Sequence, residues 1–356
     1  MSRNAQYRAR NPRLFYQVIC LSLALLFTSR AKAQEAQSFN GRTPGDARVV
    51  IVEDPGALYN LVPVPETVQS MVDRGITNLT HRSTVNAAWN SLVSTNDIVG
   101  LKVLSAPGRN SGTRPDVVAA VVQDLLAAGL PPNHIIIWDR HTTQLRLAGF
   151  FELGRRFGVR VQGSAEAGYD EKVFYDTPLL GTLAYGDFEF GKTGQGIGRK
   201  SYVSKLVAQD MTKIINLTTM LHHNVVGVSG NLYSLAFGSV DNTDRFEYTP
   251  ENLSRAVPEI YALPVLGDRV VLNIVDALIC QYDGQNQGEL HYSTVLNQLR
   301  FSKDPVALDV LSLQEINHQR ETADVPVTKS VELYSNASLL EIGISDPHRI
   351  QVEKVR

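Results

Sequence analysis

The order of predicted strands and helices between residues 98 and 161 most constrains the fold of this chain. Short apolar segments of strand length occur at 98–104, 134–139 and 159–161. Segments with helical spacing of their apolar residues separate them, at 115–128 and 144–157. Such alternation builds parallel strands with right-handed crossovers, because each helix returns the chain to the same end of the sheet. The sequence therefore predicts an α/β fold with a mostly parallel sheet and helices on both faces.

The rest of the chain repeats this pattern, with one exception. Further strands are predicted at 48–53, 211–217 and 269–276, and further helices at 65–74, 254–263 and 304–320. The exception is residues 163–200, which are rich in glycine and aromatic residues and have no helical period. We expect a lid or hairpin insertion there, within a single α/β domain over residues 34–356.

Residues 1–33 have the three parts of a signal peptide. Basic residues precede an apolar stretch, Val18 to Phe27, that is too short to span a bilayer. Ala31-Lys32-Ala33 then matches a small-x-small cleavage site. Residues 1–33 contain no adjacent pair of arginines, which a twin-arginine route would require. We expect export by a Sec-type signal, a periplasmic or extracellular mature protein that starts near Gln34, and no stable membrane anchor after cleavage. An uncleaved N-terminal anchor is the alternative.

Removal of the leader makes the chain acidic. Six of the 34 basic residues lie in it, which leaves 28 against 36 acidic residues and a net charge of −8. An acidic chain is a poor partner for nucleic acid or for anionic lipid. Cys280 is the only cysteine that remains, so the chain cannot form an internal disulfide, an iron–sulfur cluster or a zinc site of the cysteine type.

The sequence gives no nucleotide motif in a credible context. Gly186–Thr193 matches the phosphate-binding P-loop pattern, but the glycines of Gly194–Gly198 would break the helix that a P-loop must open. The second segment also lacks the spacing of a dinucleotide fingerprint. The cofactor, if the protein uses one, is unknown.

Several polar residues coincide with the expected carboxyl edge of the sheet, where open α/β sheets bind ligands. Asp139 and Asp276 each end a predicted strand and could serve as a metal ligand, a general base or a helix cap. Lys102 interrupts an apolar strand, which is costly unless the charge is paired, lies at a site or sits on an edge strand. Arg114 precedes a helix start at Pro115 and could face an anion there, or be a solvated loop residue.

His222 and His223 follow the predicted strand 211–217. Neighbouring side chains on a strand point to opposite faces, so the two rings cannot chelate one ion together. At most one belongs to a site, and a packed structural histidine is the alternative for it. Asp283 lies in the loop Tyr282-Asp283-Gly284, where a role in a turn is the alternative to binding.

Five stretches, taken in order and spacing, resemble the family catalogued as domain of unknown function 362. They are 99–103, 113–118, 136–139, 216–238, and 272–276 followed by 302–309. The resemblance covers about residues 97–319 and implies an α/β protein of unassigned activity, exported in many members. Some members carry ferredoxin-like cysteine clusters, which this chain lacks.

The resemblance also singles out His223. Where the family typically reads Asn-x-Pro-Lys-x-Lys-Thr-His, this chain reads Asn216 to His223, so His223 matches the family histidine. Thr219 and Leu221 stand in place of two lysines, and Tyr233 in place of a later one. If those lysines hold an anion in relatives, this protein is expected to bind something less charged, or to have lost the activity.

These observations predict a small-molecule site at the carboxyl edge of the sheet. The candidate residues are His223, Asp139 and Asp276 as catalytic groups and Lys102, Arg114 and Asp283 as substrate-binding groups. As an enzyme, the protein would use His223 or an aspartate as general base. A divalent metal held by Asp139, His223 and Asp276 is another version. The alternative function is a non-catalytic envelope binding or scaffold protein that has lost the site lysines.

Overall fold

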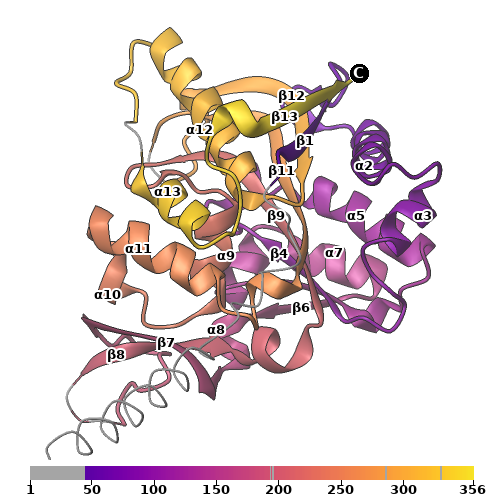
Figure 1. Cartoon of the computed structure of the whole chain (residues 1–356). Helices are drawn as coiled ribbons and strands as arrows, with labels where there is room; N and C mark the ends of the chain where they lie inside the picture. The colour runs from indigo at the N-terminus through magenta and orange to yellow at the C-terminus, as the bar shows by residue number, and fades with distance from the viewer. Residues whose placement is uncertain (1–44, 193, 195, 285–286, 329–330) are drawn as a thin grey trace, which may run out of the picture. The chain divides into compact units, whose positions relative to one another are not determined.

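A nine-stranded mixed sheet organises the protein in the computed structural model (Figure 1). The structure describes residues 45–192, 194, 196–284, 287–328 and 331–356. By their contacts these residues fall in one compact unit. The predicted signal peptide, residues 1–33, lies outside the described residues.

The sheet has the strand order β13-β1-β12-β11-β9-β4-β5-β6, and β10 pairs with β9. The strands are β1 Ala47–Glu53, β4 Val99–Val103, β5 Ile135–Asp139, β6 Arg160–Gly163, β9 Lys213–His223, β10 Gly227–Val228, β11 Val270–Gln281, β12 Ser293–Ser302 and β13 Ile350–Val355. Strands β11, β9, β4, β5 and β6 are parallel. Strand β12 is antiparallel to both β11 and β1, so β1 and β13 run with the parallel set. The predicted mostly parallel α/β sheet is confirmed.

Helices cover both faces of the sheet, each over its own apolar core. On one face lie α2 Pro65–Thr80, α3 Val85–Asn90, α5 Pro115–Ala127, α6 Thr142–Leu147 and α7 Phe150–Phe157. On the other lie α9 Asn231–Ser239, α11 Pro250–Tyr261, α12 Pro305–Thr322 and α13 Glu332–Leu339. Along β5 the side chains alternate between the cores, since Ile137 packs into the first and Trp138 into the second.

Some element bounds differ from the predicted ones. The helix expected over 144–157 is two helices, because Gly149 between them adopts φ 94° and turns the chain. The helix expected over 65–74 runs on to Thr80. Strands β9 and β11 are longer than predicted, so His223 ends its strand. Asp276 lies inside β11, just before a register shift between Ala277 and Ile279.

The insertion expected over 163–200 contains a short helix and most of a hairpin. Helix α8 Ser164–Ala167 leads into β7 Tyr169–Thr182, which pairs with β8 Ile197–Ser204. Two of its cations have partners within the hairpin: Arg199 pairs with Asp176, and Lys200 lies over the ring of Phe174. The lid role stays a prediction.

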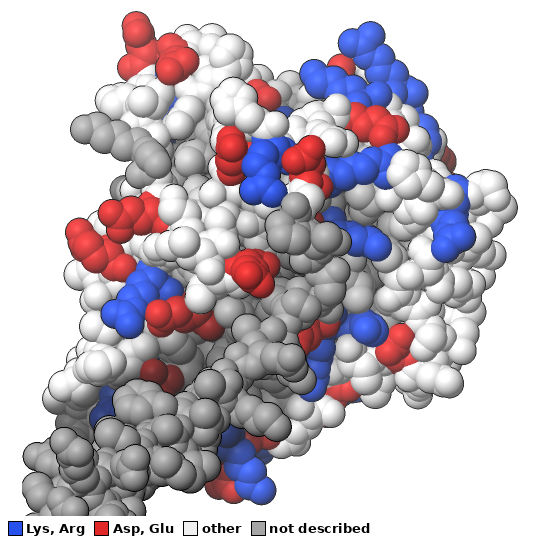
Figure 2. Space-filling model, in the orientation of Figure 1, with Lys and Arg blue, Asp and Glu red and all other residues white. Residues whose placement is uncertain are grey.

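Short elements complete the edge of the sheet on which the site lies. They are β2 Leu58–Tyr59, β3 Val62–Pro63, α4 Gly108–Ser111, α10 Asp244–Glu247 and a 3₁₀ turn at Leu290–Tyr292. Acidic and basic side chains are interspersed over the described surface that Figure 2 shows. Within the described ranges, no helix combines the length and the apolar character needed to cross a membrane.

Candidate functional site

Four of the six predicted site residues form two buried ion pairs at the carboxyl end of the sheet. Lys102 Nζ lies 2.8 Å from Asp139 Oδ1, and Arg114 Nη1 lies 2.8 Å from Asp276 Oδ1. All four side chains are at most 7% exposed. The first pair joins the neighbouring strands β4 and β5, whereas the second joins the start of α5 to β11. The predicted residues are therefore divided between separate pairs.

The Lys102–Asp139 pair is closed on itself. Besides Asp139, Lys102 Nζ donates to the carbonyl of Val103 at 2.6 Å and to Ser234 Oγ at 3.0 Å. An ammonium group has three protons, so these three partners use its full capacity. Asp139 Oδ2 accepts from the amide and the hydroxyl of Ser105, at 2.8 and 2.6 Å. Neither charge is left over for a ligand.

Burial and pairing act against each other in the pKa values of this pair. Burial lowers the pKa of Lys102, and the charge of Asp139 only partly offsets it. Burial would raise the pKa of Asp139, but the charge of Lys102 and the hydrogen bonds from Lys102 and Ser105 outweigh burial and hold that pKa below its usual value. Asp139 is therefore an ionised structural partner rather than a poised proton acceptor.

Arg114 is fixed by a bond at each side of its guanidinium. Asp276 Oδ1 accepts from Arg114 Nη1, and Asp276 Oδ2 accepts from the Arg114 amide at 3.1 Å. Arg114 Nη2 donates to the carbonyl of Asn110 at 3.0 Å. The amide of Leu278 also donates to Asp276 Oδ1, at 3.2 Å. Asp276 therefore holds the start of α5 in place.

His223 is a neutral, buried ring. Its Nδ1 accepts from the amides of Val225 and Val226, at 3.2 and 3.4 Å, so the proton of the neutral ring lies on Nε2. The ring packs against Tyr233 with centroids 4.5 Å apart. Burial, with a smaller contribution from His222, lowers the pKa of His223 to about 4. This geometry suits a hydrogen-bond donor better than a general base, because the lone pair is already occupied.

Asp283 belongs to the surroundings of His222. Its Oδ1 accepts from Arg320 Nη1 at 3.1 Å and lies 4.0 Å from His222 Nδ1. His222 Nε2 lies 3.1 Å from Thr328 Oγ1. The two adjacent histidines thus have different partners, in agreement with the opposite directions expected on a strand. Arg320 is not among the residues that the sequence predicts for a site, because it lies near the end of a long helix, α12, with no local sign of one.

The structure does not bring the three residues of the metal version together. Across the described residues, no group of three or more His, Cys, Asp or Glu side chains is placed to hold a metal ion. The physical reason is the pairing above, since Asp139 and Asp276 turn toward Lys102 and Arg114 and not toward His223.

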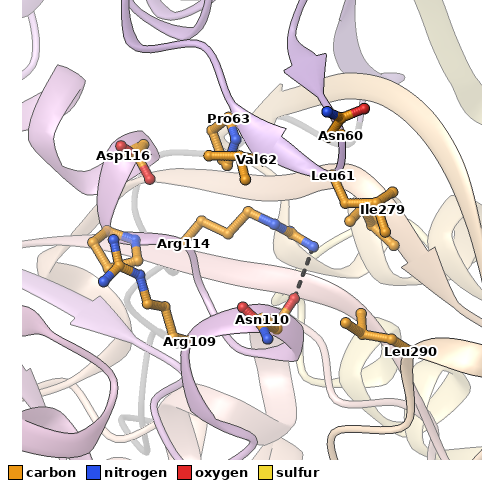
Figure 3. A pocket seen from close by; sticks show the side chains of 11 residues that line it. Asn60, Leu61, Val62, Pro63, Arg109, Asn110, Arg114, Asp116, Ile279 and Leu290 are labelled. Carbon is orange, nitrogen blue, oxygen red and sulfur yellow. Dashed lines mark hydrogen bonds between the residues drawn. The ribbon is translucent and has the colours of Figure 1, made fainter.

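A cavity of about 330 Å³ opens beside Arg114 (Figure 3). Its lining residues are Asn60, Leu61, Val62, Pro63, Arg109, Asn110, Arg114, Pro115, Asp116, Ile279 and Leu290. They come from three segments that follow or end β1, β4 and β11, which is the carboxyl edge that the sequence predicts for a site. Of the six predicted residues, Arg114 is the one among this lining.

The remaining lining residues gave little signal in the sequence. The β2–β3 hairpin turns through Asn60 and Leu61 at φ 49° and 64°, without the glycine that usually marks such a turn. Arg109 and Asp116 look like ordinary surface charges near a helix start. Leu290 lies in a short turn between β11 and β12. The hairpin over residues 58–63 has no period and no glycine, so it offers no local sign that it covers a cavity.

Fold and site together define an α/β protein with closed polar pairs and an open cavity at the carboxyl edge of its sheet. The chain belongs to the family described as Domain of unknown function (DUF362), which matches residues 99–314 and confirms the resemblance. No curated protein matches the chain. A crystal structure of a protein from Thermotoga maritima is similar at 12% identity and a TM-score of 0.38, over 76% of this chain and 61% of that one. The chain thus spans about three fifths of the length of that protein.

Loss of one charge from the Lys102–Asp139 pair should strongly destabilise the fold. Lys102→Met leaves Asp139 buried without its counter-charge, and we expect the free energy of unfolding to fall by about 3–5 kcal/mol. Lys102→Met with Asp139→Asn should recover part of the loss, because an amide oxygen can still accept from Ser105. Urea denaturation measures both. Arg160→Met is the matched control: it breaks the half-exposed pair with Asp210 and should cost less than about 1 kcal/mol. Equal losses in the two Met variants would contradict the prediction.

The buried ring of His223 should make stability fall with acidification. Its pKa drops from 6.5 when unfolded to about 4 when folded, so between these values only the unfolded chain takes up the proton. Stability from this group is present above pH 6.5 and is lost as the pH falls toward 4. His223→Asn keeps an acceptor for the two amides, and we expect it to reduce the stability lost between pH 7 and 4.5 by roughly 2 kcal/mol.

The comparison must be between variant and wild type. Burial raises the pKa of Asp241 and of Asp309 to about 7, and such groups act with the opposite sign over the same pH range. Denaturation midpoints across pH give the difference, and His348→Asn at an exposed position controls for the loss of an imidazole. A variant curve parallel to that of the wild type would show that the ring is not protonated on unfolding.

Proposed function

We propose that the mature protein is exported and binds a small molecule in the cavity beside Arg114. Export rests on the signal-peptide pattern of residues 1–33. If the intact mass of the exported protein equals that of a chain starting at Gln34, export with cleavage is supported. A mass that includes the leader would contradict it. The proposal assigns the chain a binding role and leaves the activity of its family unassigned.

The position of the cavity is the observation that carries the proposal. It lies where β4 and β11 end, and loops at the carboxyl ends of strands are where α/β folds place their ligands. Its volume of about 330 Å³ lies within the range of small-molecule pockets. Its lining combines fixed charge with apolar side chains, which is the usual composition of such pockets.

The contacts of the predicted catalytic residues favour binding over catalysis. Asp139 is saturated by Lys102 and Ser105, and Asp276 is held by Arg114. His223 has its lone pair on two backbone amides. An enzyme that used either aspartate as its base would have to break a buried ion pair to release it, which costs several kcal/mol. A binding protein needs no such step.

Filling the cavity tests the proposal. Leu290→Trp places a larger ring at the lining, and Leu339→Trp, at a position 81% exposed on α13, is the matched control. A thermal-shift screen of small metabolites on the mature wild type should find ligands that raise its melting temperature, because a ligand at 100 times its Kd stabilises by about 2.7 kcal/mol. We expect these ligands to stabilise Leu339→Trp equally and to lose their effect on Leu290→Trp.

Two results would overturn the proposal in different ways. Ligands that stabilise wild type and Leu290→Trp to the same extent would place the binding site elsewhere. A stabilising compound that the wild type converts to product, and that His223→Asn binds without converting, would establish the enzyme alternative.

A further inference from the structure

We infer that the ligand of this cavity is a zwitterion with an apolar side chain, of the α-amino-acid or short-peptide class. The inference rests on the proposed function, since it names the class of ligand for that same cavity. Three features of the lining carry it: two opposite charges that are not paired with each other, a balance of charge around them, and a separate apolar wall.

The first feature is a cation and an anion that face one cavity without meeting. Arg109 and Asp116 both line it. Among the residues that the structure describes, neither takes part in an ion pair within 4.0 Å. Arg109 is exposed and Asp116 is half-buried, so each remains open to a partner from solution. A ligand that carries a carboxylate and an ammonium would satisfy both at once.

The second feature is the balance of charge. The other lining cation, Arg114, is already neutralised by Asp276. Arg109 and Asp116 then leave the site with one positive and one negative charge. A phosphate or a dicarboxylate would meet the carboxylate of Asp116, and a polyamine would meet the guanidinium of Arg109, and like charges at close range are destabilising. A ligand with no net charge and two separated charges avoids both penalties.

The start of α5 fixes where the two ends of the ligand would lie. Asp116 is in the first turn of this 13-residue helix, directly after Pro115. Burial raises the pKa of Asp116 while the charge of Arg109 lowers it, so the two charges interact although they form no ion pair.

The third feature is the apolar wall. Leu61, Ile279 and Leu290 lie at the side of the cavity away from Arg109 and Asp116 (Figure 3). Ile279 is 5% exposed and forms buried wall, whereas Leu61 is 53% exposed at the tip of the hairpin. An apolar side chain placed there would cover surface that water now contacts, which contributes about 25 cal/mol per Å². The mixed charges on the surface shown in Figure 2 offer no single-sign field, so selection must come from this local pair.

The test uses three probes that share one skeleton. L-Leucine carries both charges, 4-methylpentanoate lacks the ammonium, and 3-methylbutylamine lacks the carboxylate. Binding to the mature protein is measured by calorimetry and by thermal shift. We expect leucine to bind at least about tenfold more tightly than either analogue, because each charge-assisted hydrogen bond is worth more than a factor of ten.

Two charge-removing variants check the assignment of each end. Asp116→Asn should lower the affinity for leucine until leucine binds no better than 4-methylpentanoate. Arg109→Gln should lower the affinity for leucine until leucine binds no better than 3-methylbutylamine. Thermal melting of the unliganded variants serves as the folding control, and Leu290→Trp should abolish binding of all three probes.

The outcomes separate this inference from the proposed function. If the acid or the amine binds as tightly as leucine, the zwitterion class is wrong while the cavity remains a binding site. The same holds if none of the three binds but other ligands are blocked by Leu290→Trp. If no ligand of any class is blocked by Leu290→Trp, the cavity itself is not the site and both proposals fail.

Discussion

The buried ion pair of Lys102 and Asp139 is the constraint on which the carboxyl edge of this sheet depends. It links β4 to β5, and through Ser234 it ties both strands to helix α9. Asp139 Oδ2 accepts from the amide and the hydroxyl of Ser105, the second residue after β4. The pair therefore also sets the direction in which the next loop leaves the sheet. A pair this deeply buried adds little net stability by itself. The loss of one partner lowers the free energy of unfolding strongly, so both side chains have to keep their places.

The same loop is held again at its far end, and the cavity follows from that. Thr113 Oγ1 donates to the carbonyl of Leu217 and accepts from the amide of Leu104, which returns the chain to the sheet. Arg114 is then fixed by Asp276. Between these anchors the segment around α4 cannot collapse onto the strands, and Arg109 is carried to the rim. Polar contacts that bind no ligand themselves therefore shape the space in which one can bind.

How much of this the sequence could predict depends on the range of each interaction. The strand–helix alternation between residues 98 and 161 is local, so the fold class followed from periodicity alone. Lys102 is marked by its place in an apolar run, because an unpaired buried charge is costly wherever it lies, and Asp276 by its place at the end of a predicted strand. The partner of each buried charge depends on the strand order β11-β9-β4-β5. No short segment of the sequence predicts that order. The cavity could not be predicted from the sequence, because the hairpin that turns at Leu61 has no glycine to mark it.

The family resemblance implies lysines around His223, and this chain has uncharged residues in their place. Thr219 and Leu221 are buried without charge, and Tyr233 stacks on both His223 and Phe237. The surroundings of His223 are thus aromatic. Burial, with a smaller contribution from His222, lowers the pKa of His223 to about 4. An anionic ligand there would meet none of the three lysines that the family resemblance implies. At the rim of the cavity, Arg109 and Asp116 carry charges of opposite sign that remain open to solvent, and the apolar wall lies at the opposite side. The proposed binding of a charged ligand is therefore assigned to the cavity and not to the histidine.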